Sequence, residues 1–590
     1  MSFRVLLAAA LVASPLTAHA ANETLQPQSE THSNGIPMQL DAGQRDAYRE
    51  VFQAIHDKRW DDAKLQLASM KPGPLHAVAL AELYTAPGSP KIALDPLLAL
   101  LAEAPELPEA DDIARLAKLR GAESLPDIPA EQRLVWYNGA PNRVRLKMSK
   151  SDATSADLSD KMRPFIKADD GASAEALFNS VSGDLDDEAK TEWRQRISWI
   201  YYLAGDDANA RRVAALAQQG TGPFVAHADW VEGLASWRDN DCQSAENAFT
   251  LVAQHATDVD LRAAGLYWAS RADLACGRPD LIQARLESAA QYKQTFYGML
   301  ARQSLGILDK PGPDIDAVAA TDWRQLKHLP NVRVAAALVE IGENALADKV
   351  MRHQAKIGNP RDYAALTRLA GKMDLPGTEL WLSHYSPRGE QPLETARYPL
   401  PDWTPHGGWR VDKALVYAHT LQESKFDPTV VSPAGAYGLM QIMPAAASDI
   451  GRERGEVIDR AALTKPSVNM EVGQTYLEKL RDMPSTGGLL PKVIAAYNAG
   501  PSPVQAWNLS TRDNGDPLLY IESIPYWETR GYVMTVLRNY WMYEKKEDKP
   551  SPSRAALAQG LWPRFPGMPG AKGVRLTAND KVAQRAARAD

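Results

Sequence analysis

One stretch of the chain, residues 422–444, reads QESKFDPTVVSPAGAYGLMQIMP and combines a helix end, a turn and a second helix start. Upstream of it, apolar residues recur at helical spacing on one stripe that also includes Gln422. This stripe predicts the core face of a helix: Val411, Ala414, Leu415 and Ala418. Glu423 then falls between the core face and the solvent face, a position that suits the wall of a cleft. We expect the helix to end at Asp427, because a residue that precedes proline avoids the helical region.

The residues after this helix predict a tight return of the backbone. Gly435 and Gly438 follow Ser432 and Pro433 and permit close backbone approach to a ligand, and Pro444 is typical of the first turn of a new helix. A single Glu on a helix is most often a solvated surface residue. The interpretation of Glu423 therefore depends on the residues that accompany it.

Those accompanying residues resemble, in order and spacing, the first motif of the soluble lytic transglycosylases, which are similar to goose-type lysozyme. The matching positions are Glu423, Ser424, Ser432, Gly435, Ala436, Gly438, Leu439, Met440, Gln441, Met443 and Pro444. Residues 495–501, AAYNAGP, look like the second motif of the family, and residues 520–533, YIESIPYWETRGYV, look like the third. Residues 295–301, TFYGMLA, resemble the helical part of the long soluble members. On these motifs the chain is identified as a member of the long, soluble branch of that family.

Length and composition limit the classes of protein that the chain can represent. With 590 residues it exceeds the size at which one core keeps growing, so two or three domains are expected. Its net charge of −7 gives no basic footprint for nucleic acid. We expect no metal site, because Cys and His residues do not cluster, and no cofactor.

The first residues have the pattern of a secretory signal. Arg4 precedes an apolar run over residues 5–13, and Ala18, His19 and Ala20 form a small-x-small cleavage site, so residues 1–20 are predicted to be a signal peptide. A buried first helix is the alternative. No cysteine lies near the cleavage point, which argues against a lipoprotein, and no later segment has eighteen uninterrupted apolar residues. We expect a periplasmic protein without a membrane-spanning segment in its mature form.

The chain has two cysteines, Cys242 and Cys276. In an oxidising compartment they can pair and close a loop of about 35 residues, worth about 4 kcal/mol in the chain-entropy model. Two separate buried thiols are the alternative. We favour the disulfide, because the two residues lie on what look like adjacent helices.

The patterns along the chain predict a mainly α protein. Residues 21–40 are polar and predict a flexible leader, and residues 41–321 show recurring helix pairs that predict a degenerate tetratricopeptide-like solenoid, or superhelix. Its Trp and Tyr residues stand at helical spacing, which is more typical of core than of a carbohydrate platform. The family resemblance implies that this region curls into a ring.

The remaining chain is divided by composition. Residues 322–397 predict a helical linker subdomain that ends in a Pro- and Gly-rich boundary. Residues 398–548 carry the three motifs and are expected to form a predominantly α, lysozyme-like domain. Residues 549–590 are rich in Pro, Ala, Gly and Arg, and we expect a disordered tail.

Cleavage of a glycosidic bond usually requires two carboxylates, but only Glu423 stands in a motif that supports such a role. Asp427 precedes Pro428 and is better explained by a turn role. Glu528, in the third motif, is the better candidate to approach the cleft, and by resemblance it contacts substrate instead of acting as a nucleophile.

A single carboxylate fits a reaction in which the substrate supplies the missing groups. By resemblance, Glu423 protonates the oxygen between N-acetylmuramic acid and N-acetylglucosamine in peptidoglycan and then takes a proton from the C6 hydroxyl, which closes a 1,6-anhydro ring. An acid that later serves as base should have a raised pKa, and Met440, Met443 and Tyr497 are the expected apolar walls.

The resemblance also implies roles for other residues. Ser432 and Gln441 would hydrogen-bond the sugar, Met443 would pack against a sugar ring, Tyr497 would position the substrate, and Asn498 would orient the loop that carries Tyr497. The alternatives are that Gln441 and Asn498 satisfy backbone groups and that Met443 belongs to the core.

Three functions remain open at this point. The first is a lytic transglycosylase acting on peptidoglycan glycan strands, as a monomer, with the solenoid as a surface for cell-wall synthesis proteins. The second is a lysozyme-like muramidase that admits water to the same site, and the third is a non-catalytic peptidoglycan-binding scaffold. The missing second carboxylate and the motifs favour the transglycosylase.

Overall fold

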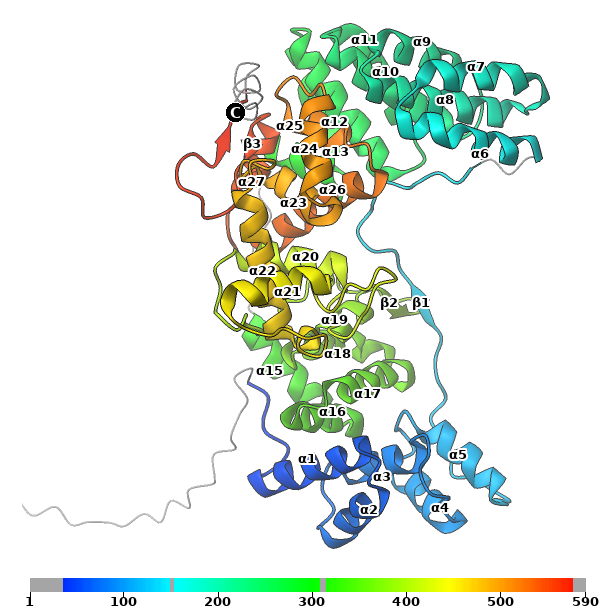
Figure 1. Cartoon of the computed structure of the whole chain (residues 1–590). Coiled ribbons are helices and arrows are strands. Elements are labelled where there is room, and N and C mark those ends of the chain that lie inside the picture. The colour runs from blue at the N-terminus through cyan, green and yellow to red at the C-terminus, as the bar shows by residue number, and fades with distance from the viewer. Residues whose placement is uncertain (1–34, 149–152, 308–314, 577–590) are drawn as a thin grey trace, which may run out of the picture.

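The structure is a computed structural model that describes residues 35–148, 153–307 and 315–576. It is mainly helical, as predicted, and consists of an N-terminal lobe, an upper arm and a C-terminal domain that lies between them (Figure 1). Two short antiparallel ribbons, β1–β2 and β3–β4, complete the part of the chain that the structure describes. No helix within these described ranges is long and apolar enough to cross a membrane.

The N-terminal lobe combines two segments that are far apart in the sequence. The first contains α1 (Ala42–His56), α2 (Trp60–Ser69), α3 (His76–Thr85), α4 (Leu94–Glu103) and α5 (Ala110–Leu119). The second contains α15 (Ile315–Leu326), α16 (Pro330–Ile341), α17 (Asn344–Ile357), η2 (Pro360–Asp362), α18 (Tyr363–Lys372) and α19 (Pro376–Leu382). Apolar residues of both segments form one core, so the boundary expected at residue 321 does not separate two cores.

Hydrogen bonds between the two segments reinforce this shared core. Asn331 donates its side-chain amide to the Glu106 carbonyl at 2.7 Å, and Arg49 donates to the Glu340 carbonyl at 3.2 Å. The prediction of residues 322–397 as a separate linker subdomain is therefore wrong for 322–382, because its helices bury their apolar faces against α1–α5. The end of the predicted leader also belongs here, since Ile36 and Leu40 are buried; residues 1–34 lie outside the described residues.

The upper arm is the regular part of the predicted solenoid. It contains α6 (Ala153–Ala168), α7 (Gly171–Val181), η1 (Ser182–Asp184), α8 (Asp187–Ala204), α9 (Asp207–Gln218), α10 (Phe224–Arg238), α11 (Cys242–His255), α12 (Val259–Ala275), α13 (Pro279–Ala290) and α14 (Phe296–Ser304). Successive helices pack in antiparallel pairs, and a side chain at Gly233 would overlap the ring of Phe249, which explains the close approach of α10 and α11. The Cys242–Cys276 disulfide, favoured from the sequence, links α11 to the end of α12.

A largely extended segment, residues 121–148, connects the N-terminal lobe to the upper arm, and we call it the strap (Figure 1). The helical pattern predicted for residues 41–321 fails here. Within the strap, β1 (Leu134–Trp136) pairs with β2 (Tyr385–Pro387), in the register Val135 opposite Ser386. The strap then runs along the C-terminal domain and satisfies its backbone groups there and at β2, for example by the hydrogen bond from the Tyr137 amide to the His384 carbonyl at 2.7 Å.

The C-terminal domain begins after η3 (Glu394–Arg397) and carries all three sequence motifs. Its elements are α20 (Lys413–Glu423), α21 (Pro444–Arg454), η4 (Ala462–Thr464), α22 (Pro466–Asp482), α23 (Leu490–Ala499), α24 (Pro501–Ser510), α25 (Pro517–Glu522), α26 (Trp527–Lys546), α27 (Pro552–Ala558), β3 (Trp562–Pro563) and β4 (Gly573–Val574). The long helix α26 lies centrally and packs against α20 and α23. The hydrophobic core of the C-terminal domain is continuous with the core of the upper arm.

The prediction of a disordered tail from residue 549 is wrong for residues 549–576. Trp562 is fully buried, and its indole donates to the Gly515 carbonyl at 2.8 Å. Phe565 is also buried, and Trp541 of α26 donates to Ser553 of α27 at 2.9 Å. Burial of these aromatic side chains offsets the cost of ordering a Pro- and Gly-rich segment. Residues 577–590 lie outside the described residues.

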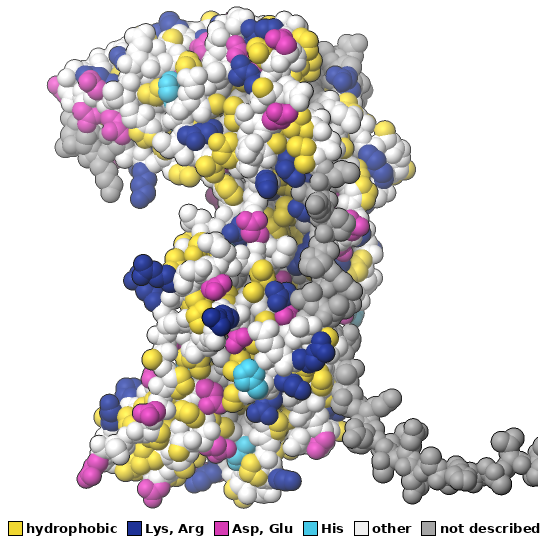
Figure 2. Space-filling model, turned by 180° about the vertical axis from the view of Figure 1, so that it is seen from behind, with side chains coloured by type: hydrophobic (Ala, Val, Ile, Leu, Met, Phe, Trp, Pro, Cys, Tyr) yellow, Lys and Arg dark blue, Asp and Glu magenta, His cyan; other side chains and the backbone are white. Residues whose placement is uncertain are grey.

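A buried ion-pair network joins the strap, the upper arm and the C-terminal domain. Arg143 of the strap contacts Glu522 of α25 at 2.7 Å and Asp260 of α12 at 3.4 Å, and it lies over the ring of Trp230. Glu522 also accepts a hydrogen bond from Tyr297 of α14 at 2.7 Å. The C-terminal domain is thereby fixed against the upper arm, which projects over an open hollow (Figure 2).

Candidate active site

Helix α20 places Glu423 at its last position. Asp412 caps the start of the helix by accepting a hydrogen bond from the Ala414 amide at 2.9 Å. The helix ends four residues earlier than predicted, because Lys425 and Phe426 adopt positive φ angles of 54° and 65°, which no continuing α-helix permits.

This early end changes the surroundings of the site. The ring of Phe426 turns back into the core beside Tyr417 and Trp403, while Glu423 stays partly buried at the helix end. Gln422 was placed on the core stripe by its spacing, and this is wrong, because its side chain is exposed and lines a pocket.

The carboxylate of Glu423 has one hydrogen-bond partner among the described side chains, the phenol of Tyr532 on α26. Tyr532 donates to Oε1 of Glu423 at 2.5 Å. Burial raises the pKa of Glu423 to about 7 and the charge of Glu528 adds to the rise, although the hydrogen bond from Tyr532 opposes it. Glu423 can therefore hold a proton near neutral pH and release it again, as the predicted acid–base role requires.

A cluster of rings forms the floor beneath this carboxylate. His419, one turn before Glu423 on α20, is fully buried, and its ring lies 4.8 Å from that of Tyr497 and 6.1 Å from that of Tyr532. Burial lowers the pKa of His419 to about 4, so the ring is neutral, and its Nδ1 donates to the Leu415 carbonyl at 3.0 Å. This neutral, aromatic floor explains why Glu423 is desolvated without a cationic partner.

The return loop after α20 is held by its own polar side chains. Ser432 accepts a hydrogen bond from the Ala436 amide at 3.0 Å, and Gln441 donates to the carbonyls of Gly438 at 2.9 Å and Val430 at 3.3 Å. These contacts match the structural alternative for Gln441, although both side chains remain partly exposed. Gly438 has a φ of 71°, and a Cβ there would lie 2.3 Å from the Leu463 carbonyl, so only glycine fits.

The second motif brings two predicted residues to the same place. Tyr497, at the end of α23, donates to the Met440 carbonyl at 2.8 Å and fixes the return loop from below. Asn498 accepts a hydrogen bond from Thr529 at 2.7 Å, which links the second motif to the start of α26. Met440 is fully buried, whereas Met443 is 45% exposed and does not belong to the core. Met443 is therefore free to contact a ligand.

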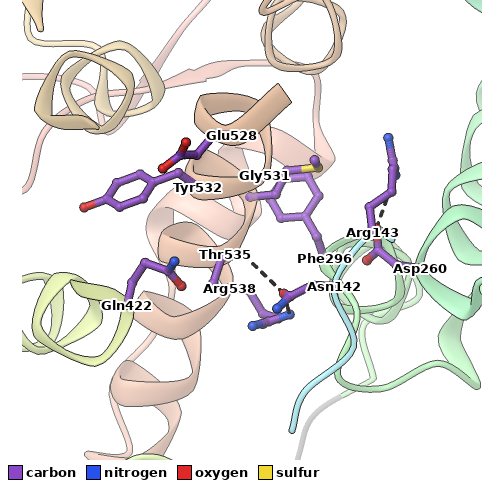
Figure 3. A pocket seen from close by; sticks show the side chains of 11 residues that line it. Asn142, Arg143, Asp260, Phe296, Gln422, Glu528, Gly531, Tyr532, Thr535 and Arg538 are labelled. Atoms are coloured by element: carbon purple, nitrogen blue, oxygen red, sulfur yellow. Dashed lines mark hydrogen bonds and ion pairs between the residues drawn. The ribbon is translucent and has the colours of Figure 1, made fainter. Parts of the chain in front are cut away.

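A pocket of about 210 Å³ opens beside Tyr532, and Figure 3 shows the side chains around it. Residues of α20, α26, the strap, α12 and α14 line it: Asn142, Arg143, Asp260, Phe296, Gln422, Glu528, Gly531, Tyr532, Met534, Thr535 and Arg538. Glu528 and Tyr532 project from one face of α26 (Figure 3), as their four-residue spacing requires. Glu528 is exposed at the pocket, as expected for a residue that approaches the cleft.

Several contributors to this site were not predicted, among them His419, Tyr532 and Asn142. Tyr532 lies inside the third motif, and its position one helical turn after Glu528 was the available signal. Asn142 comes from the strap and accepts hydrogen bonds from Thr535 at 3.2 Å and Arg538 at 2.8 Å (Figure 3). No sequence pattern indicated that the strap reaches the pocket. Across residues 35–148, 153–307 and 315–576, no group of His, Cys, Asp and Glu is arranged to hold a metal ion.

A helical arm joined to a compact helical domain, with one desolvated Glu at a helix end, defines the class of proteins that carry a lysozyme-like transglycosylase domain. Residues 406–519 match the family model of the Transglycosylase SLT domain. The soluble lytic murein transglycosylase of Salmonella typhimurium is 30% identical over 287 residues, and that of Escherichia coli is 35% identical over 138 residues. The chain therefore carries a Transglycosylase SLT domain and is similar to soluble lytic murein transglycosylases.

The extent of these similarities is limited. The aligned parts cover 46% and 22% of this chain, and 42% and 20% of the two relatives, so the chain spans less than half of their length. The 70 kDa soluble lytic transglycosylase of Escherichia coli matches over 89% of this chain and 99% of its own, with a TM-score of 0.53 and 19% identity. An inactive mutant of lytic transglycosylase Slt from Pseudomonas aeruginosa matches over 85% and 86%, with a TM-score of 0.51 and 19% identity. The similarities to these two solved structures, at 19% identity, show the fold alone.

Proposed function

We propose that the chain is a peptidoglycan lytic transglycosylase that cleaves the β-1,4 bond between N-acetylmuramic acid and N-acetylglucosamine and forms 1,6-anhydromuropeptides. One observation carries the proposal: Glu423 is a desolvated carboxylate whose pKa is raised to about 7, with a phenol as its hydrogen-bond partner. Glu528, the carboxylate that raises this pKa by its charge, is exposed on α26 and makes no hydrogen bond to Glu423 among the described contacts. Glu423 is therefore proposed to act alone.

In the first step Glu423 gives its proton to the bridging oxygen as the bond from that oxygen to the anomeric carbon breaks. In the second step the C6 hydroxyl oxygen bonds to the anomeric carbon, and its proton returns to Glu423. No water is consumed, and Glu423 ends the cycle in its starting form. The substrate's own acetamido carbonyl stabilises the positive charge between the two steps.

The surrounding residues support both steps. Tyr532 stabilises the carboxylate after the first proton transfer, since its phenol donates to Oε1. Tyr497 holds the return loop beneath the site through Met440, and the exposed side chain of Met443 is proposed to contact a sugar ring. Ser432 and Gln441 are proposed to hydrogen-bond the sugar with the capacity that their loop contacts leave unused.

We further propose that the chain works in the periplasm after export. The predicted signal peptide at residues 1–20 lies outside the described residues. The Cys242–Cys276 disulfide supports an oxidising compartment, where such bonds persist.

Mass spectrometry of fragments released from purified peptidoglycan tests the proposal. The mature protein should release products one water lighter than the corresponding reducing muropeptides, and Glu423→Gln should release almost none while remaining folded. Glu456→Gln, which alters an exposed carboxylate of the same domain, is the matched control and should keep full activity. Products with reducing ends would identify a muramidase, and no release by the unaltered protein would favour a binding scaffold.

A further inference from the structure

A second pocket, of about 230 Å³, lies at the opposite end of the α20–α26 pair from Glu423. The C-terminal segment after α26 forms its outer side, so the pocket exists only because residues 549–576 are ordered. Its lining residues come from the start of α20, the end of α26 and that segment: Asp412, Tyr540, Glu544, Lys549, Pro550, Pro552, Ser553, Arg564, Phe565, Pro566, Gly567, Met568, Ala571 and Lys572. Most of these residues lie outside the matched SLT domain, which ends at residue 519.

The side of the pocket formed by α20 and α26 is acidic and incompletely satisfied. Tyr540 donates to Oδ2 of Asp412 at 3.1 Å, while Oδ1 of Asp412 accepts from the Ala414 amide. Glu544 is 2% exposed, and its Oε2 has no hydrogen-bond partner among the described residues. A buried carboxylate oxygen without a donor is unfavourable, so a ligand group that donates to Oε2 would be stabilised here.

The outer side of the pocket is basic. Lys549, Arg564 and Lys572 line it, and Lys549 and Lys572 are exposed. Lys549 contacts Glu547 at 3.0 Å and also lies within electrostatic reach of Asp412 and Glu544, so it does not stand apart from the acidic wall. Arg564 donates to the Pro569 carbonyl at 2.9 Å and retains unused donor capacity toward an anion. Apolar groups also line the pocket, among them the ring of Phe565 and the side chain of Met568.

This arrangement selects for a particular kind of ligand. An ammonium group meets its complement at Glu544 and Asp412, a carboxylate meets its complement at Arg564 and Lys572, and a short aliphatic chain can contact the apolar groups of the lining. An engineered cavity of about 150 Å³ binds benzene, so 230 Å³ is sufficient for a ligand with a somewhat larger body. We propose that this pocket binds a small aliphatic zwitterion, of the diamino-acid type, with its ammonium group at Glu544 and a carboxylate at Arg564 and Lys572.

The burial of Glu544 is consistent with such a ligand. Desolvation raises the pKa of Glu544 to about 7 and the charge of Asp412 adds to the rise, whereas hydrogen bonding to Ser551 and Tyr540 opposes it. Arg554 and Lys549 already act on Glu544 by their charge, so an incoming ammonium group would chiefly supply the donor that Oε2 lacks.

The proposed function gives this ligand a natural source, because peptides attached to peptidoglycan carry amino-acid ends of this kind. Only the source rests on the proposed function; the chemistry of the pocket does not. Glu423 lies about 16 Å away along α20, at about 1.5 Å per residue, so the pocket is separate from the site of bond cleavage. A wall peptide bound in this pocket would therefore be a different part of the substrate from the sugar that is cleaved at Glu423.

Isothermal titration calorimetry on the full mature chain tests the proposal with three probes that share a chain of five carbons carrying the charged groups. Meso-diaminopimelate carries ammonium and carboxylate groups, cadaverine carries ammonium groups, and pimelate carries carboxylates. We expect binding of meso-diaminopimelate and at least about 10-fold weaker binding of the other two, since each lacks one of the two charged contacts. Equal binding of cadaverine or pimelate would overturn the proposal, as would no binding of meso-diaminopimelate at millimolar concentration.

Variants locate the binding. Glu544→Gln and Lys572→Gln should each weaken meso-diaminopimelate at least about 10-fold, whereas Glu456→Gln should leave it unchanged. Lys572 is exposed, so its variant keeps the test decisive if Glu544→Gln unfolds. Unchanged affinity in Lys572→Gln would place the ligand elsewhere and refute the proposal.

A further arm distinguishes a wall peptide from the free amino acid. A soluble muropeptide with meso-diaminopimelate in its peptide should bind at least as tightly as the free compound, and weaker binding would assign the pocket to the free amino acid. These titrations require no turnover, so a failure of the proposed enzymatic activity would leave them unaffected.

Discussion

Replacing Tyr532 by Phe tests how the structure sets the proton affinity of Glu423. The change removes one hydroxyl from a buried ring and thereby the hydrogen bond to Oε1 of Glu423 at 2.5 Å. A hydrogen bond to a charged group is worth about 1.5–3 kcal/mol, and one pKa unit corresponds to about 1.4 kcal/mol. The pKa of Glu423 should therefore rise from about 7 by about 1–2 units.

The direction of the effect follows from the form of Glu423 that the phenol favours. Tyr532 stabilises the carboxylate, so its loss leaves Glu423 protonated to higher pH. Because the proposed cleavage requires the protonated form, the alkaline limb of the profile of kcat/KM against pH should move upward by the same 1–2 units. The maximal rate should fall, since the carboxylate formed after cleavage is less stable.

The assay is release of soluble fragments from purified peptidoglycan, measured across pH 5 to about 10. Tyr497→Phe is the matched control, because its phenol donates to the Met440 carbonyl at 2.8 Å and not to Glu423. Its alkaline limb should stay in place. An alkaline limb that stays fixed or moves to lower pH in Tyr532→Phe would refute the assignment of Glu423 as the titrating acid or of Tyr532 as its partner.

Three further predictions concern stability. Burial alone would raise the pKa of Glu471, but hydrogen bonds from arginines lower it to about 2. This carboxylate therefore stabilises the fold above pH 4.5, and its contribution is lost as the pH falls toward 2. Glu471→Gln should therefore lower the free energy of unfolding at pH 7 by up to about 3 kcal/mol and should have little effect near pH 2. Denaturant titrations that show an equal loss at both pH values would contradict this prediction. Replacing Cys242 and Cys276 by Ser should destabilise the upper arm by about 4 kcal/mol, and a reducing agent should lower the calorimetric Tm of the parent protein but not of the variant. Deleting residues 549–590 should destabilise the C-terminal domain by several kcal/mol, since Trp562 alone contributes about 2–3 kcal/mol; an unchanged Tm would show that the segment is dispensable.

Local patterns predicted the parts of the site that lie close together in the sequence. Glu423, the return loop and Gly438 stand within one motif, and their spacing carried enough information to place the carboxylate at a helix end. The helix end itself was misjudged by four residues, because the proline rule gives the latest possible end and not the left-handed turn at Lys425 and Phe426. Such a turn is stabilised by burial of Phe426, which depends on tertiary contacts.

Contacts between distant segments were not predicted. Tyr532 is 109 residues from Glu423, and Asn142 is 393 residues from Thr535, so neither partner could be derived from periodicity. The predictions for the N-terminal lobe and for the C-terminal segment were wrong for the same reason. Composition describes a segment by itself, whereas Trp562 and α16 become buried only against surfaces that other parts of the chain form. A single sequence therefore predicts the chemistry of a local motif better than the packing between distant segments of the chain.

The divided N-terminal lobe has a consequence for how the molecule acquires its structure. Its first half ends near residue 120, and the helices that complete its core begin only at residue 315. Closing a loop of about 200 residues costs about 5 kcal/mol of chain entropy before any contact forms, and such long-range pairing is slow. The upper arm, built from neighbouring helices, can fold as soon as its own residues are present. The N-terminal lobe must wait for residues 323–382, so the first segment of the chain reaches its native packing only after the whole upper arm has been made.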